Sequence, residues 1–173
     1  METDLETGSS FEENATLKAQ GYASMSRLTT LADDSGLEVD ALGGRPGVYS
    51  ARHGGRTTDQ GRIELLLSEL QRVPWEKRTA HFRCAIAVNP GLKGGNDVIL
   101  YSGECPGIIC LEPRGANGFG YDPLFYLPDL GKTMAELTFD EKNRVSHRAQ
   151  AAQRVRPSLE ELFRGQIDNE RPL

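Results

Sequence analysis

The sequence has little of several features that mark particular classes of protein. It contains three cysteines, Cys84, Cys105 and Cys110, and no C-x-x-C pair. An odd number of cysteines cannot close a disulfide framework, so a reducing compartment fits best. No apolar run reaches the length that spans a membrane, and the opening METDLETGSS lacks the basic and apolar regions of a signal peptide. We expect a cytoplasmic protein with no membrane partner.

A clustered basic excess is also lacking. The 173 residues carry a formal net charge of −5, with a pI near 5.3. Nucleic-acid polymers and membrane surfaces attract clustered positive charge, so neither is expected as a partner. A small anionic substrate is still compatible with a local basic pocket. A chain of this length suits one domain that buries about 70% of its unfolded surface, and we expect a single domain over residues 1–173.

The first half of the chain is expected to alternate between helices and strands. Ser10 and Glu13 form an S-x-x-E capping box, which predicts a helix from Phe11 to about Met25. The segments RLTTLAD and GLEVDAL are each typical of a short strand, which places an acidic pair at a strand end. In TTDQGRIELLLSELQRV the apolar residues recur at helical spacing, and TAHFRCAIAV alternates as a half-buried strand does.

Glycine and proline divide the second half of the chain. PGLKGGND is expected to be a hairpin loop, and VILYSGECPGIICLEP is expected to form two strand segments broken at Pro106 and Gly107. RGANGFGYDPLF is expected to be a glycine-rich loop. The last third is predicted to be helical, with capping boxes that begin at Thr138 and Ser158 and with Pro157 dividing the last helix from its predecessor.

The first cluster that could carry chemistry is the pair Asp33 and Asp34 in the string DDSG. Two adjacent carboxylates repel, so keeping both ionised near a buried strand end requires a divalent cation or a network of hydrogen bonds. Magnesium is the leading candidate. The alternative is a solvated turn in which the aspartates cap local N–H groups. This string alone does not decide between the two.

The second cluster is GFGYDP, in the glycine-rich loop. Its glycines allow the backbone to approach a ligand closely. Phe119 and Tyr121 offer ring faces on which a flat heterocycle could stack, and Asp122 offers a hydrogen-bond acceptor. The alternative is an ordinary glycine-rich turn whose aromatic side chains lie in the core.

The third cluster, EKNRVSHRAQ, places positive charge at a predicted helix start. Ser146 is expected to cap the helix, which puts His147 and Arg148 in the first turn, where the helix dipole disfavours cations. A phosphate at the exposed N–H groups, or the keto oxygens of a base, would compensate. Lys142 lies just before this turn and could join it. The alternative is a solvated basic surface.

Four blocks of the sequence occur in a fixed order: TGSSFEENATLKA, LADDSGLEVDALGGRPGVYSAR, GANGFGYDPLF and GKTMAELTFDEKNRVSHR. In this order they resemble the inosine triphosphate pyrophosphatase family, also known as the Ham1-like proteins, over nearly the whole chain. The resemblance implies an α/β fold with an elongated mixed sheet, flanking helices and two lobes around a central cleft. It also implies a homodimer that hydrolyses ITP, dITP and XTP to the monophosphate and pyrophosphate, using Mg²⁺.

The resemblance implies roles for individual residues as well. Asp34 corresponds to the catalytic carboxylate that binds metal and activates water, Asp33 would support its charge and orientation, and Ser35 would contact substrate. The remaining substrate contacts correspond to Phe119, Gly120, Tyr121, Asp122, Lys142, His147 and Arg148. Donors aimed at a 6-keto oxygen would accept hypoxanthine or xanthine, and such sites reject the wrong partner, here adenine, by about 10⁴-fold or more. Guanine shares the 6-keto oxygen, so its exclusion needs another cause.

The sequence departs from the family pattern in two places. The family normally begins with a strand, a T-x-N-x-x-K loop and a helix that grip the triphosphate, whereas this sequence begins just before TGSSFEENA. We therefore expect a domain truncated at its N-terminus. The family motif E-x-x-G has Leu5 at its acidic position, and Glu6 is the candidate replacement as metal ligand. Three hypotheses stay open: an active pyrophosphohydrolase, a catalytically impaired purine-nucleotide-binding protein, and an unrelated magnesium phosphatase that uses DDSG.

Overall fold

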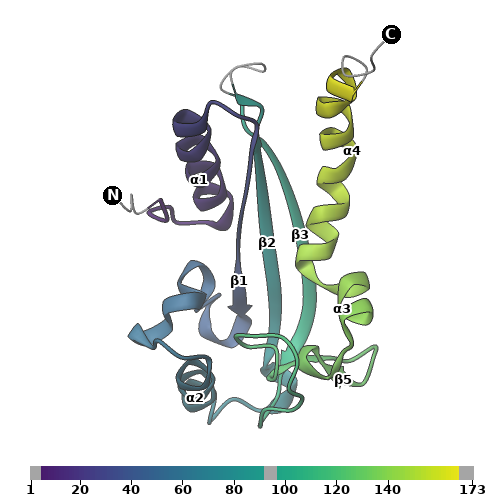
Figure 1. Cartoon of the computed structure of the whole chain (residues 1–173). Helices are drawn as coiled ribbons and strands as arrows, with labels where there is room; N and C mark the ends of the chain where they lie inside the picture. Colours follow the sequence, from purple (N-terminus) through teal and green to yellow (C-terminus); the bar gives the residue numbers. More distant parts are fainter. Residues whose placement is uncertain (1–4, 92–96, 168–173) are drawn as a thin grey trace.

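Three long antiparallel strands form the centre of the molecule (Figure 1). The computed structural model describes residues 5–91 and 97–167. The long strands are β1 (Thr30–Val39), β2 (Thr79–Asn89) and β3 (Ile99–Ile109), and two short strands, β4 (Phe125–Leu127) and β5 (Lys132–Thr133), follow them in the order β1-β2-β3-β4-β5. Every strand pair in these residues is antiparallel. The expected α/β class, with helices flanking an elongated sheet, is confirmed, but the sheet that was expected to be mixed is antiparallel throughout the described residues.

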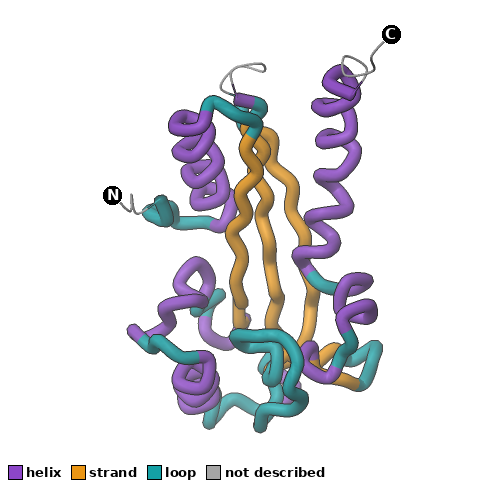
Figure 2. Tube along the Cα trace, in the orientation of Figure 1, coloured by secondary structure: helices purple, strands orange, loops and turns teal. Residues whose placement is uncertain are grey.

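Two helices cover opposite faces of β2 (Figure 2). Helix α1 (Phe11–Ser26) packs on Ala85 and Ala87, and helix α4 (His147–Ile167) packs on Cys84, Ile86 and Val88. Successive side chains of a strand point to opposite faces of the sheet. The two helices therefore bury both faces of β2, beyond the single buried face that its alternating sequence predicts.

The start of α4 lies directly on β3. A Cβ atom at Gly103 would lie 2.1 Å from the backbone oxygen of His147 and 2.6 Å from the backbone nitrogen of Ala151. Both distances are well inside van der Waals contact, so only a residue without a side chain allows this approach. Gly103 thus determines how closely the first turns of α4 approach the sheet.

The other elements gather at one end of the sheet, around the largest core cluster (Figure 1). Helix α2 (Asp59–Glu69) and helix α3 (Phe139–Val145) lie there with four 3-10 segments. These segments are η1 (Asp40–Leu42), η2 (Gly47–Gly55), η3 (Trp75–Lys77) and η5 (Met134–Glu136). Leu37 of β1, Leu66 of α2 and Phe125 of β4 are each fully buried in the cluster, so it joins the sheet to the surrounding loops.

Two expected strand breaks are absent. RLTTLAD and GLEVDAL were expected as separate strands, but β1 runs without interruption through Asp33 and Asp34, paired residue by residue with β2. β3 likewise continues through Pro106 and Gly107. In the described part of the chain β3 pairs with β4 only at Ile108 and Ile109, so Pro106 lies where one side of the strand is open, a position at which strands tolerate proline.

The prediction that Pro157 divides the last helix is also wrong. Helix α4 continues through Pro157, because side chains on both sides of it, including Val155 and Leu159, pack against the same cluster on the sheet. Ser158 does not begin a new capping box; its Oγ instead accepts a hydrogen bond from the Tyr101 hydroxyl. The helix predicted from Phe11, with its Ser10 cap, and the capping box of Thr138 are confirmed.

Two further expectations concern a hairpin loop and the membrane. The predicted hairpin loop PGLKGGND falls largely on residues 92–96, outside the described residues. Among the helices that the structure describes, none is long and apolar enough to cross a membrane.

Candidate active site

Strand β1 sends Asp33 and Asp34 to opposite faces of the sheet. Asp34 lies opposite Ala85, which belongs to the cluster under α1, and Asp33 lies opposite Ile86, which belongs to the cluster under α4. Adjacent residues of a regular strand must diverge in this way. The expectation of one crowded acidic pair at a strand end is therefore wrong, and each carboxylate has its own positively charged partner.

On the α1 face, Asp34 is held by two side chains of that helix. Lys18 Nζ lies 3.0 Å from Asp34 Oδ1, and Asn14 Nδ2 donates to Asp34 Oδ2 at 3.1 Å. Asn14 is 1% exposed, and its Oδ1 accepts from the Gly8 N–H at 2.8 Å, so the amide must turn its NH₂ toward Asp34. The carboxylate of Asp34 is consequently fixed in position and offered as an acceptor.

Glu6 joins this cluster through the same lysine. Lys18 Nζ lies 3.0 Å from Glu6 Oε1, and Arg52 Nη1 lies 3.1 Å from Glu6 Oε2. The hydrogen bond from Lys18 is the main cause that lowers the pKa of Glu6. Burial by itself lowers the pKa of Lys18, but its bonds to Asp34 and Glu6 outweigh burial and raise it. Two carboxylates thus share one ammonium group.

The α1 cluster contains two residues that sequence reasoning did not select. Asn14 and Lys18 are four residues apart, so they lie on the same face of a helix. That spacing was a usable signal, but it became meaningful only once β1 was known to place a carboxylate opposite that face.

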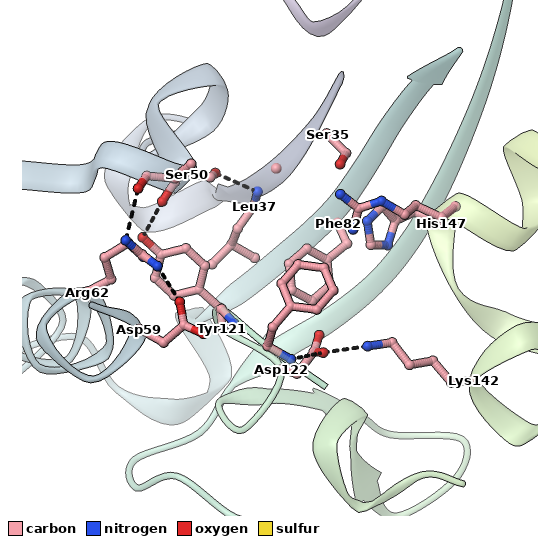
Figure 3. Close-up of a pocket in the computed structure, with 15 residues that line it drawn as sticks. Ser35, Leu37, Ser50, Asp59, Arg62, Phe82, Tyr121, Asp122, Lys142 and His147 are labelled. Carbon is pink, nitrogen blue, oxygen red and sulfur yellow. Dashed lines mark hydrogen bonds and ion pairs between the residues drawn. The ribbon is translucent and has the colours of Figure 1, made fainter. Parts of the chain in front are cut away.

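On the α4 face, a pocket of about 160 Å³ opens between β1, β2, η2, α2 and the start of α4 (Figure 3). Its lining includes every residue predicted to contact substrate: Ser35, Phe119, Gly120, Tyr121, Asp122, Lys142, His147 and Arg148. Asp33, Asp34 and Glu6 do not line it. The residues of three separate sequence blocks therefore meet in one pocket, with the acidic cluster of the α1 face across the strand.

His147 is a neutral, buried ring at the back of the pocket. It is 5% exposed and stacks on Phe82 with centroids 4.9 Å apart and an interplanar angle of 17°. Burial, followed by the charges of Arg148 and Lys142, lowers the pKa of His147 to about 3. Its Nδ1 atom has no hydrogen-bond partner in the described structure. A buried polar atom without a partner is costly, so Nδ1 is suited to a polar ligand atom.

Phe119 is an exposed ring with two cations against it. Its exposed fraction is 61%, and both Lys142 Nζ and the Arg148 guanidinium carbon lie 5.3 Å from its centroid. Arg148 Nε also lies 3.4 Å from Asp33 Oδ2. The positive charge expected to be unfavourable in the first turn of α4 is thus compensated within the protein by Asp33 and the ring. Ser146 caps that helix as predicted, accepting from the Ala149 N–H at 3.2 Å.

Tyr121 does not offer the free ring face that was expected of it. It is 4% exposed, and its ring belongs to the main core cluster. Its hydroxyl donates to the Ser50 carbonyl at 3.2 Å and lies 3.2 Å from His53 Nδ1. Burial raises the pKa of the Tyr121 hydroxyl. The alternative of an aromatic side chain in the core is correct for Tyr121, while Phe119 alone is free to stack.

Hydrogen bonds from several elements fix the loop between these aromatic residues. Asp122 is 4% exposed, accepts from the Phe119 N–H at 3.0 Å and forms an ion pair with Lys142. The Gly120 N–H donates to Asp59 Oδ2 at 2.7 Å. Sequence reasoning missed Asp59, because nothing in the sequence indicates that the start of α2 meets this loop.

The donor set on the α1 face suits a hard cation only in part. Within residues 5–91 and 97–167, no group of three or more His, Cys, Asp or Glu side chains gathers as a metal site. Asp34 and Glu6 nevertheless present carboxylate oxygens, the ligands that Mg²⁺ prefers. Both face the ammonium of Lys18, so this place already accommodates a positive charge.

The architecture defines an α/β protein in which an antiparallel sheet separates a charged cluster from a polar and aromatic pocket. A narrower assignment follows from comparison with known families: residues 1–158 match the model of the Ham1 family. The chain belongs to this family, and the resemblance inferred from its four sequence blocks is confirmed.

Relatives and solved structures agree with this assignment. A dITP/XTP pyrophosphatase of Bacillus subtilis is 53% identical over 156 residues, which cover 90% of this chain and 77% of that protein. A dITP/XTP pyrophosphatase of Halalkalibacterium halodurans is 52% identical over 151 residues, covering 87% and 76%. The structure of a HAM1 protein from Coxiella burnetii matches with a TM-score of 0.84 at 44% identity, covering 90% of this chain and 79% of that chain.

Proposed function

We propose that this chain hydrolyses the triphosphates of inosine, deoxyinosine and xanthosine to the nucleoside monophosphate and pyrophosphate. The observation that carries the proposal is the division at β1: Ser35 lines an aromatic and polar pocket, while its neighbour Asp34 faces the charged cluster of α1. The relatives at 52% and 53% identity bear the name dITP/XTP pyrophosphatase. A base bound on one side of the strand would direct its phosphates toward the other.

The pocket on the α4 face would recognise the purine. Phe119 supplies an exposed ring for stacking, and the buried Nδ1 of His147, which has no hydrogen-bond partner in the described structure, would bond to a polar atom of the base. A neutral imidazole can donate or accept a hydrogen bond. Arg148 and Lys142 add donors near the ring, which suits the 6-keto oxygen of hypoxanthine or xanthine. The 6-amino group of adenine would leave those donors unpaired.

The cluster on the α1 face would carry the hydrolytic step. Asp34 would accept a proton from the attacking water, whose oxygen bonds to the α-phosphorus while the bond from that phosphorus to the β-bridging oxygen breaks. Pyrophosphate leaves with the bonding electrons. Lys18 would hold Asp34 in place and offset phosphate charge. Asp34 and Glu6 would hold Mg²⁺, which when bound neutralises phosphate charge and lowers the pKa of a bound water.

Asp33 receives a different role from the one that the resemblance suggested. Its carboxylate lies on the opposite face from Asp34 and pairs with Arg148 at 3.4 Å. We propose that Asp33 orients this guanidinium beside Phe119 and does not support the charge of Asp34.

We also propose that the chain acts as a cytoplasmic homodimer and that residues 1–173 form one domain. The resemblance supports the dimer, and so do exposed apolar side chains that a partner subunit would cover, such as Phe139 (79% exposed) and Leu28 (68% exposed). Light scattering from the purified chain should give twice the 19.0 kDa mass of one chain; a mass of one chain at micromolar concentration would contradict it.

The function is tested by incubating the purified chain with ITP and Mg²⁺ and measuring both pyrophosphate and orthophosphate. Release of pyrophosphate from ITP, dITP and XTP, and far less from ATP, supports the proposal. Binding of ITP without release would identify a catalytically impaired nucleotide-binding protein. Release of orthophosphate alone would identify a magnesium phosphatase.

A further inference from the structure

The loop that carries Phe119 is tethered from two sides. Gly120 has a φ of 61°, a left-handed conformation that glycine adopts readily, and its N–H donates to Asp59 Oδ2 at 2.7 Å. From the other side, Lys142 donates to Asp122. Lys142 and Asp122 belong to the site predicted from the sequence, but Asp59 is 61 residues away from Gly120 and belongs to α2. Asp59 therefore links α2 to the loop.

Asp59 is not needed to cap its own helix. The N-cap of α2 is Thr58, whose hydroxyl accepts from the Gly61 N–H at 3.1 Å. An acidic residue in a first turn ordinarily acts through the helix dipole, and that role requires no distant partner. Because Thr58 supplies the cap, the Asp59 carboxylate is available for Gly120.

Arg62 fixes the position of the Asp59 carboxylate. Its guanidinium pairs with Asp59 Oδ1 and donates to the carbonyl oxygens of Ala51 at 2.9 Å and Arg56 at 3.1 Å. Figure 3 shows Asp59 and Arg62 together, beside Tyr121. The Gly120 N–H, followed by Arg62, lowers the pKa of Asp59. The carboxylate is thus ionised at neutral pH, and hydrogen bonds to ionised acceptors are the stronger kind.

We propose that Asp59 is a positioning residue for purine recognition: its hydrogen bond to the Gly120 N–H holds the loop so that the Phe119 ring is ready to stack on a base. The proposal rests on the proposed function, since it assigns the purine to this pocket. Asp59 acts through the loop backbone, so its loss should weaken nucleotide binding and leave the hydrolytic step on the α1 face nearly intact.

The test compares three substitutions of Asp59 in the full chain. Asp59→Ala removes the acceptor, Asp59→Asn keeps an oxygen at the same reach without the charge, and Asp59→Glu keeps the charge but moves it by one methylene. Calorimetry with inosine monophosphate (IMP), the product of the proposed reaction, measures binding without turnover. Steady-state kinetics with ITP separates kcat from KM. We expect Asp59→Ala to raise the Kd for IMP and the KM for ITP about 10-fold with kcat within about 3-fold.

The matched variants make the role of the hydrogen bond specific. Asp59→Asn should bind IMP within about 3-fold of the original chain, because its amide oxygen keeps the reach to the Gly120 N–H and loses only the roughly twofold greater strength of a bond to an ionised acceptor. Asp59→Glu should bind more weakly than Asp59→Asn, because the added methylene displaces its acceptor from the Gly120 N–H. Gln60→Ala is the control on the same helix, because the Gln60 side chain bonds to Glu64 at 2.8 Å within α2. It should leave IMP binding unchanged. If Asp59→Ala does not fold, the comparison of Asp59→Asn with Asp59→Glu carries the test.

Three binding results would overturn the proposal: unchanged IMP binding in Asp59→Ala, binding in Asp59→Asn as weak as in Asp59→Ala, or an equal loss in Gln60→Ala. Amide hydrogen exchange at Gly120 gives a readout that does not depend on the proposed function. It should accelerate in Asp59→Ala, and unchanged exchange would show that Asp59 does not hold the loop. If the original chain neither binds IMP nor releases pyrophosphate, the proposed function fails, whereas Gly120 exchange still reports on the anchor.

Discussion

The two faces of β1 differ in the kind of interaction that they offer. On the α1 face, Asp34 and Glu6 share the ammonium of Lys18, so the contacts are between full charges. On the α4 face, a neutral His147 stacks on Phe82, and an exposed Phe119 borders the pocket. Adjacent residues of one strand thus supply two different environments. Substitutions on the two faces should accordingly separate the rate of hydrolysis from the affinity for the base.

The largest effect is expected from Asp34→Asn on the α1 face. Because an amide cannot accept the proton of the attacking water, kcat for ITP should fall about 10²- to 10⁴-fold. The Kd for IMP should stay within about 3-fold, since Asp34 does not line the pocket proposed to bind the base. Pyrophosphate assays and calorimetry on the same preparation measure both values. A kcat equal to that of the original chain would refute the role of Asp34.

Phe119→Ala should have the opposite signature. Removing the exposed ring eliminates stacking worth about 1–3 kcal/mol, so the Kd for IMP should rise between about 5-fold and 150-fold. At saturating ITP, kcat should change little, because the ring is not part of the α1 cluster. Phe163→Ala is the control, since Phe163 is also a partly exposed ring, at 40%, but lies on α4 away from the pocket lining. An equal loss in the control would contradict the assignment.

His147 should affect stability in a way that depends on pH. Its pKa is about 3 in the folded chain, against an ordinary value of 6.5, so the unfolded chain binds more protons between these values. The free energy of unfolding should therefore fall as the pH falls through this window. Urea titrations measure the free energy of unfolding at pH 6.5 and pH 5. Between these values it should fall by about 1–2 kcal/mol more in the original chain than in His147→Gln.

The comparison with His147→Gln isolates His147 from the other groups that titrate in this pH window. Burial also lowers the pKa of His53, but His53 is present in both chains and cancels in the comparison. Identical losses of stability in His147→Gln and the original chain would mean that His147 becomes protonated without difficulty in the folded state.

The smallest effect is expected from Asp33→Asn. Asp33 and Arg148 are each about half exposed, with side-chain exposures of 46%, and exposed ion pairs contribute about 0–1 kcal/mol. The KM for ITP should rise about 2- to 5-fold while kcat is maintained. If kcat fell as far in Asp33→Asn as in Asp34→Asn, Asp33 would belong to the hydrolytic cluster. The functional distinction between the two faces of β1 would then be wrong.

The sequence predicted the residues of the pocket better than their arrangement. Ser35, Phe119, His147 and Arg148 line one pocket, as the family resemblance of the sequence blocks that contain them implied. The helix from Phe11 was predictable from its Ser10 cap. Local signals of this kind need no knowledge of which segments lie together.

What could not be predicted depends on contacts between distant segments. The Ser-Gly pair after Asp34 is typical of a turn, yet pairing with β2 along ten positions keeps it in a strand. Pro157 is typical of a helix end, yet packing on both sides of it maintains α4. Lys18 and Asp59 gain their roles only from partners 16 and 61 residues away. In each case tertiary contacts override a local preference.

Gly103 determines the position of His147 in the pocket, although Gly103 itself does not line the pocket. It contacts no ligand, but the missing side chain lets the backbone of His147 settle against β3. A single added methyl group would lift the first turn of α4 and carry the imidazole away from Phe82 with it. Under the proposed function, a substitution in β3, outside the pocket lining, would therefore change the selectivity for the base.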